Sequence, residues 1–190
     1  MSKNQFAEVI QAAILSLPQD CKACLRVVED PDLEDAHRIA AAGALLHVLS
    51  GSNVIPGMRG TLSYVDDVLV MRLIIERITK AAPETMARHG EEFPEVLDRM
   101  AGQLSVAKQY LGELMRVLEH AADGVGKLHY HGHGAADCVS DAEGSTWLYD
   151  AVQEAIVDQL DFDEEEVGRA VKSVEQVLPP LRQRANTLGV

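Results

Sequence analysis

The sequence predicts an all-α fold, a single domain over residues 1–190 built as a multi-helix bundle. Apolar residues recur at spacings of three and four almost everywhere outside one glycine-rich stretch, which is the period of amphipathic helices. The composition, 47% hydrophobic but only 4% aromatic, suits helices packed on aliphatic side chains. A chain of 190 residues can bury one sizeable core. We therefore expect about seven or eight helices around a single core.

The centre of the predicted bundle lies at residues 45–78, where two very apolar helices follow one another. The first opens at Asp32 and runs to about Ser50, and its small residues 40–44 allow a neighbouring helix to approach closely. The second starts near Ser63. Its apolar residues cover nearly the whole circumference: Leu62, Val65, Val68, Leu69, Val70, Met71, Leu73, Ile74, Ile75 and Ile78. Such a helix belongs inside a bundle.

Shorter and longer helices flank this centre. Before it, we expect a helix over residues 4–17 and a short helix from Pro18 to about Asp30; after it, a short helix to His89 and the longest helix over about 94–122. Apolar residues form a heptad seam along the longest one: Leu97, Met100, Leu104, Ala107, Leu111, Leu114, Leu118 and Ala121. This seam predicts a helix partner within the bundle, with a homodimer contact as the alternative.

The chain ends in two further predicted helices. Ser145 or Thr146 can cap the first, which reaches about Leu160. The acidic run 161–166 can open the second, which Pro179 and Pro180 break or kink.

Residues 50–67 carry a resemblance to a known family. Ser50, Ile55, Pro56, Leu62, Tyr64, Asp66 and Asp67 match, without a gap, the hallmark segment of the YkvA-like (DUF1232) family, which the chain resembles over about residues 22–79. Residues 84–190 would then be additional helices of the same bundle. The segment departs from the family where Gly51 replaces proline and where Asn53 and Gly57 replace aspartates.

The resemblance implies a helical module with no agreed activity, of which some members sit at membranes. Our leading prediction is therefore a non-catalytic protein-interaction module with an unknown protein partner, in which Asn53, Asp66 and Asp67 are candidate binding residues. Paired carboxylates can bind a divalent cation or transfer protons. The alternative is structural, because Ser63 and Asp66 fit a capping pattern that would place both acids at a helix start.

Three histidines give an alternative function. Residues 123–144 lack helical periodicity and contain five glycines, so we expect a long loop there. In an extended segment His129, His131 and His133 would point the same way, and imidazole is a good ligand for a transition metal such as zinc or nickel. Asp137, Cys138 or His120 could complete the site. In the opposing interpretation, the loop is mobile and binds metal only adventitiously.

A third function rests on Cys21 and Cys24. A C-x-x-C pair near a helix start can lower a thiol pKa and form a dithiol redox couple. The alternative is that both are small core residues on one helix face.

Charge and hydropathy exclude other classes of function. The formal charge is −13 and the pI is near 4.9, and no basic cluster is present, so we expect no nucleic-acid partner. The most apolar run, 68–75, is interrupted by Arg72, so we expect no transmembrane segment. Residues 1–17 do not resemble a signal peptide, which predicts a cytoplasmic protein with reduced cysteines.

Overall fold

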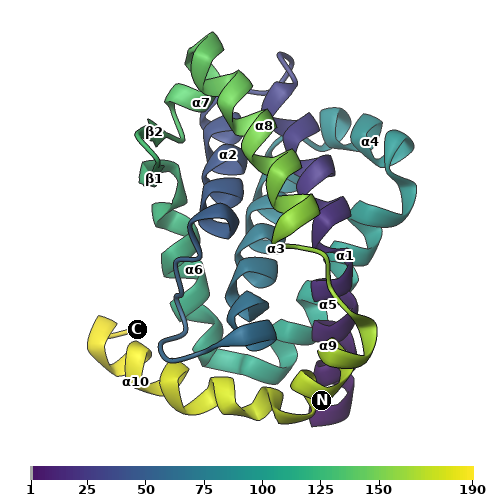
Figure 1. Cartoon of the computed structure of the whole chain (residues 1–190), viewed down its shortest axis with the longest axis vertical. Coiled ribbons are helices and arrows are strands. Elements are labelled where there is room, and N and C mark those ends of the chain that lie inside the picture. The colour runs from purple at the N-terminus through teal and green to yellow at the C-terminus, as the bar shows by residue number, and fades with distance from the viewer. Residues whose placement is uncertain (1) are drawn as a thin grey trace.

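A computed structural model describes residues 2–190 and confirms the all-α prediction (Figure 1). The α-helices are α1 (Lys3–Glu29), α2 (Asp35–Ser50), α3 (Tyr64–Ala81), α4 (Pro83–Glu92), α5 (Pro94–Leu111), α6 (Met115–Gly124), α7 (Asp137–Ser140), α8 (Ala142–Asp158), α9 (Glu164–Ala170) and α10 (Leu178–Leu188). Short 3-10 segments are η1 (Gly60–Ser63), η2 (Gly112–Leu114), η3 (Val125–Lys127) and η4 (Val171–Val177). A small hairpin pairs β1 (His129–Tyr130) with β2 (His133–Gly134). Within residues 2–190, no helix combines the length and apolarity needed to cross a bilayer.

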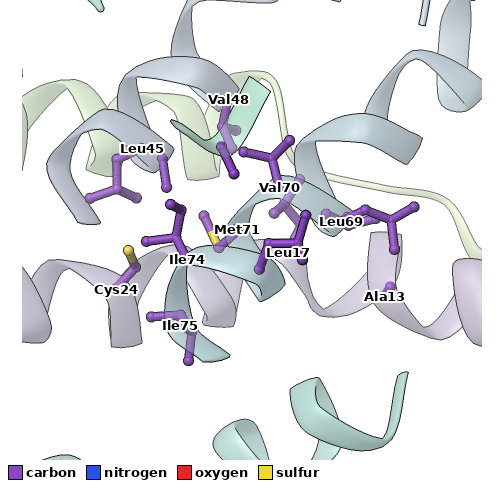
Figure 2. Packing of buried hydrophobic residues seen from close by; sticks show 14 of the residues in the cluster. Ala13, Leu17, Cys24, Leu45, Val48, Leu69, Val70, Met71, Ile74 and Ile75 are labelled. Carbon is purple, nitrogen blue, oxygen red and sulfur yellow. The ribbon is translucent and has the colours of Figure 1, made fainter. Parts of the chain in front are cut away.

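Helix α3 lies at the centre of the bundle, as its sequence predicts. It contacts α1, α2, α4, α5 and α6, and its residues Val65, Val68 and Leu69 are completely buried. Figure 2 shows side chains of α1, α2 and α3 meeting in one apolar cluster. A helix that is apolar all round is stable only when neighbours cover every face, and this arrangement supplies them.

Helix α1 continues through Pro18, so the expected break at this residue is wrong. An interior proline removes one backbone hydrogen bond and costs about 3 kcal/mol. Leu17 is completely buried and Cys21 nearly so, one on each side of the proline. We attribute the continuity to this packing, which holds both halves of α1 against the core.

The predicted helix over 94–122 is divided into α5 and α6. The division falls at Gly112, whose φ of 54° and ψ of −129° suit glycine and disfavour other residues. Leu104 and Leu111 on α5 and Leu118 on α6 are all buried within this chain. These positions of the heptad seam therefore pack inside the bundle.

Residues 123–144 are more regular than the expected loop. Helix α6 extends to Gly124, η3 follows it, and a two-residue turn closes the hairpin with positive φ at His131 (50°) and Gly132 (86°). Positive φ at both turn residues matches the twist of a tight hairpin. Helix α7 then leads to α8, which Asp141 caps in place of Ser145 or Thr146. The glycines thus serve turns between short elements.

A buried ion pair joins the first, third and fifth helices. The Arg72 Nη2 atom of α3 donates to Asp20 Oδ2 of α1 at 2.9 Å, and both side chains are fully buried. Gln103 Oε1 of α5 accepts from Arg72 Nε at 2.9 Å and from Nη2 at 2.7 Å. Asp20 Oδ1 also accepts from Arg99 Nη2 at 2.9 Å. Paired and hydrogen-bonded in this way, the charges are tolerated in the core.

A glycine sets the distance between α2 and η3. A Cβ atom at Gly43 would collide with the backbone carbonyl of Val125. By contrast, a Cβ at Gly102 on the exposed side of α5 would meet nothing within 4 Å. At Gly43 the α2–η3 contact is therefore backbone against backbone.

We predict that Arg72→Met lowers the free energy of unfolding by about 3–5 kcal/mol, because it leaves Asp20 buried with only Arg99 as a charged partner. Chemical denaturation measures this change. The control is Arg77→Met on the same helix, whose ion pair with Asp123 is solvent-exposed; it should cost less than about 1 kcal/mol. Equal losses in the two variants would contradict the prediction.

We also predict opposite effects of alanine at two helical glycines. Gly43→Ala should destabilise the protein by roughly 1–3 kcal/mol, since Val125 must move away. Gly102→Ala should stabilise it by about 0.5–1 kcal/mol through helix propensity alone. Denaturation of both variants tests the pair, and stabilisation by Gly43→Ala would refute the close approach.

Candidate functional site

A cavity of about 300 Å³ lies between the end of α2, the segment after it, α6, η3 and α10. Its apolar lining comes from Val54, Val117, Ala121, Val125, Leu128 and Leu188. Its polar lining comes from His47, Ser52, Asn53, His120 and Arg184. A mostly apolar pocket into which a few polar groups converge from distant segments is typical of small-molecule sites.

His47 connects this cavity to a buried acidic pair. Its Nε2 atom lies 3.4 Å from Asp66 Oδ2 and 3.5 Å from Asp67 Oδ1. All three side chains are at least nine-tenths buried. The last turns of α2 supply the histidine and the first turn of α3 supplies the acids. The connection between these helices folds back, so the two ends meet.

The acidic pair is incompletely satisfied by the protein. His47 Nε2, Asp66 Oδ1 and Asp67 Oδ1 have no hydrogen-bond partner within the chain, although each is buried. Burial, and secondarily the neighbouring Asp66, raises the pKa of the Asp67 carboxyl well above its usual range. Asp67 therefore tends to hold its proton, which relieves repulsion within the pair. Buried polar atoms left in this way are typical of functional sites.

Both acids lie in the first turn of α3, as the capping interpretation expects, but the capping hydrogen bonds are absent. Ser63 makes no capping hydrogen bond, and its hydroxyl donates to Gly60 O instead. Asp66 Oδ2 accepts a 2.6 Å hydrogen bond from the backbone N–H of Val54. The acid thus fixes the segment that forms one wall of the cavity.

The three candidate binding residues are only partly brought together. Asp66 and Asp67 lie side by side behind His47, whereas Asn53 lines the cavity and donates from Nδ2 to Gly51 O at 3.2 Å. Sequence reasoning missed His47 and Arg184, and it named His120 only as a possible metal ligand. The sequence offers one signal for His47, which is its position among the apolar residues at the end of α2.

The histidines of the hairpin do not form a metal centre. His129 Nδ1 lies 3.0 Å from Lys127 O, His131 occupies the turn, and His133 stacks on Trp147 with ring centroids 4.3 Å apart. Among residues 2–190, no group of three or more His, Cys, Asp and Glu side chains is placed to hold a metal ion. The expected convergence of the three imidazoles is therefore wrong, and the transition-metal hypothesis gains no support.

The other proposed ligands serve different contacts. Asp137 Oδ2 accepts from the Gly134 N–H at 2.8 Å and so closes the hairpin. Cys138 is buried, and burial raises the pKa of its thiol to about 11. His120 lines the cavity described above.

Cys21 and Cys24 are free thiols buried in the core. Burial raises the pKa of Cys24 to about 12 and that of Cys21 well above its usual value. A reactive dithiol needs a lowered pKa and access to solvent. The structure therefore favours the interpretation of both as small core residues.

We predict that the free energy of unfolding of Asp67→Asn increases relative to that of the parent as the pH rises. Because the folded-state pKa is raised, the folded chain holds the proton to higher pH than the unfolded chain. The parent's free energy of unfolding therefore falls as pH rises from about 3.8 towards the folded-state pKa. The asparagine variant lacks this loss. Denaturation at a series of pH values between about 4 and 7 measures the difference.

The control for this experiment is Asp66→Asn. An amide weakens the hydrogen bond to Val54, so this variant should lose about 1–3 kcal/mol at neutral pH. A difference between Asp67→Asn and the parent that does not change with pH would contradict the assignment.

Comparison with models of known protein families, with characterised proteins and with solved structures found no match to this chain. The resemblance of residues 22–79 to the YkvA-like family therefore stays a prediction.

Proposed function

We propose that the chain is a non-catalytic binding module whose cavity takes a small organic acid with an apolar part. The observation that carries the proposal is the convergence of Arg184 and two imidazoles, His47 and His120, on a cavity with mainly apolar walls. Its volume of about 300 Å³ falls at the lower end of the range for small-molecule sites.

The charge of the lining supports an anionic ligand. The chain carries a formal charge of −13, yet none of the described residues that line the cavity is acidic. Arg184 offers a planar guanidinium, the group best suited to a bidentate contact with a carboxylate. Lining side chains such as Leu128, Val117 and Leu188 would pack on the apolar part of the ligand. A guanidinium in a lining that holds no acidic residue favours organic anions over cations.

The buried acids support a positioning role for His47. Its Nε2 faces Asp66 and Asp67, and Asp66 holds Val54 through its backbone N–H. Asp66 thus contacts both the His47 ring and the segment that forms one wall of the cavity. In this proposal His47 orients the ligand, and the acids behind it fix the ring.

The protein-interaction role inferred from the family resemblance and the homodimer suggested by the heptad seam remain predictions. Within residues 2–190 the exposed large apolar side chains are Tyr149, Val157 and Val190. Tyr149 and Val157 lie on α8 and Val190 ends the chain. The cavity is the better supported binding feature, because polar side chains from separate helices converge on its apolar lining.

The proposal predicts that straight-chain carboxylates of increasing length raise the melting temperature in a saturable manner at constant ionic strength. A ligand at 100 times its Kd would add about 2.7 kcal/mol to the free energy of unfolding. Arg184→Gln should weaken this response about tenfold or more, because it removes a charge-assisted pair. Thermal unfolding monitored by fluorescence measures both.

Arg182→Gln is the matched control, since Arg182 is exposed on the same helix and does not line the cavity. It should respond like the parent. The alcohols of the same chain lengths test the need for charge. If no carboxylate stabilises the parent, or if both arginine variants respond alike, the proposal fails.

A further inference from the structure

A second cavity, of about 260 Å³, lies beside the hairpin and is lined by aromatic rings. Tyr130 and His131 come from the hairpin, Trp147, Ala151 and Glu154 from α8, and Leu49 from the end of α2. In Figure 1 the hairpin lies at the edge of the bundle near α2. None of these residues lines the cavity of His47.

The rings stand at angles to one another. The Tyr130 and Trp147 centroids are 6.2 Å apart with an interplanar angle of 54°, and the Tyr130 and His131 centroids are 4.2 Å apart at 60°. A cation attracted to aromatic faces sits within about 6 Å of each ring centroid. Two rings at this separation can therefore both lie within that distance of one cation.

The hairpin and a stacked histidine hold these rings in place. His131 adopts a positive φ of 50°, which is uncommon for a residue with a side chain and places its ring beside Tyr130. His133 stacks on Trp147 almost in parallel, at an interplanar angle of 15°. Both aromatic walls are thus supported by neighbours, which lowers the entropic cost of forming a cage on binding.

Charge completes the site. Glu154 is exposed and places a carboxylate at the lining of the cavity. The remaining lining adds no lysine or arginine side chain among the described residues. With a formal charge of −13, the chain as a whole also attracts cations.

We propose that this cavity binds a quaternary or methylated ammonium group, with Tyr130 and Trp147 as the aromatic walls and Glu154 as the counter-charge. Choline-like small molecules and trimethylated lysine side chains share this chemistry. Aromatic cages that recognise such groups use the same combination of ring faces and charge. The site shares no lining residue with the proposed organic-acid cavity, and it selects a ligand of opposite charge.

Tryptophan fluorescence provides a direct readout, since Trp147 is the single tryptophan of the chain. Choline should change the emission in a saturable manner. Its neutral isostere 3,3-dimethylbutan-1-ol has the same shape without the charge and should bind at least about fivefold more weakly. Sodium chloride at matched ionic strength corrects for general salt effects.

Three variants of exposed residues separate the site from the fold. Glu154→Gln should weaken choline binding about threefold to fivefold, as expected for a partly solvated charge pair. His131→Asn keeps a residue that tolerates the turn but removes a ring, and it should also weaken binding. Asp158→Asn on the same helix does not line the cavity and should bind as the parent does. Circular dichroism checks that each variant is folded.

A peptide that carries trimethyllysine, compared with its neutral carbon isostere, distinguishes the source of the ligand. Tighter binding of this peptide than of choline assigns the site to a protein tail, and the reverse assigns it to a small molecule. Either result supports the cage. If neither cation gives a saturable change, or if each neutral isostere binds as well as its cation, the proposal is overturned. Equal binding by Glu154→Gln and Asp158→Asn would remove Glu154 from the site.

Discussion

The buried pair of Arg72 and Asp20 is the constraint on which the rest of the bundle depends. It joins α1 to α3, and Gln103 extends it to α5. A guanidinium has fixed donor directions, so these helices can meet in only a few registers without leaving a charge unpaired. Apolar packing alone would tolerate small sliding between smooth aliphatic faces. The polar network removes that freedom from the core.

Buried acids take two different forms in this protein. Asp20 accepts hydrogen bonds from Ser16, Arg72 and Arg99, so its charge is fully compensated. Asp67 has no such donor, and burial raises its pKa. The first arrangement holds helices together, and the Asp20 oxygens are already occupied by hydrogen bonds from the protein. The second keeps a titratable group behind a cavity, where it can respond to what binds there.

The sequence predicted the helical class and the central position of α3 because a period of three to four is set by local geometry and survives in any tertiary context. It failed where tertiary packing overrides local preference. Buried neighbours carry α1 through Pro18, and the φ of Gly112, which divides α5 from α6, is not visible in an apolar pattern. The glycines near His131 suggested a long loop, but they close turns between short elements.

The candidate site was predictable only in part for the same reason. Asp66 and Asp67 stand out in sequence as a pair, and the structure places them together. His47, His120 and Arg184 reach one cavity from three helices that are far apart along the chain. No spacing rule relates such positions, because their proximity arises from the fold. For the three hairpin histidines, the prediction from spacing was wrong. It required an extended strand, and the turn at His131 interrupts that strand.

The close approach of Gly43 to Val125 bears on how the specificity of the cavity can change. Val125 forms part of the cavity lining, and its position is set by main-chain atoms rather than by a side-chain rotamer. Residues such as Val117 and Leu188 project from other elements into the same space. Leu188 is only partly buried, so it can be enlarged or reduced without moving the frame that Gly43 defines. The frame and this part of the lining are thus separable, so the shape of the cavity can be changed by side-chain volume while the backbone stays as it is.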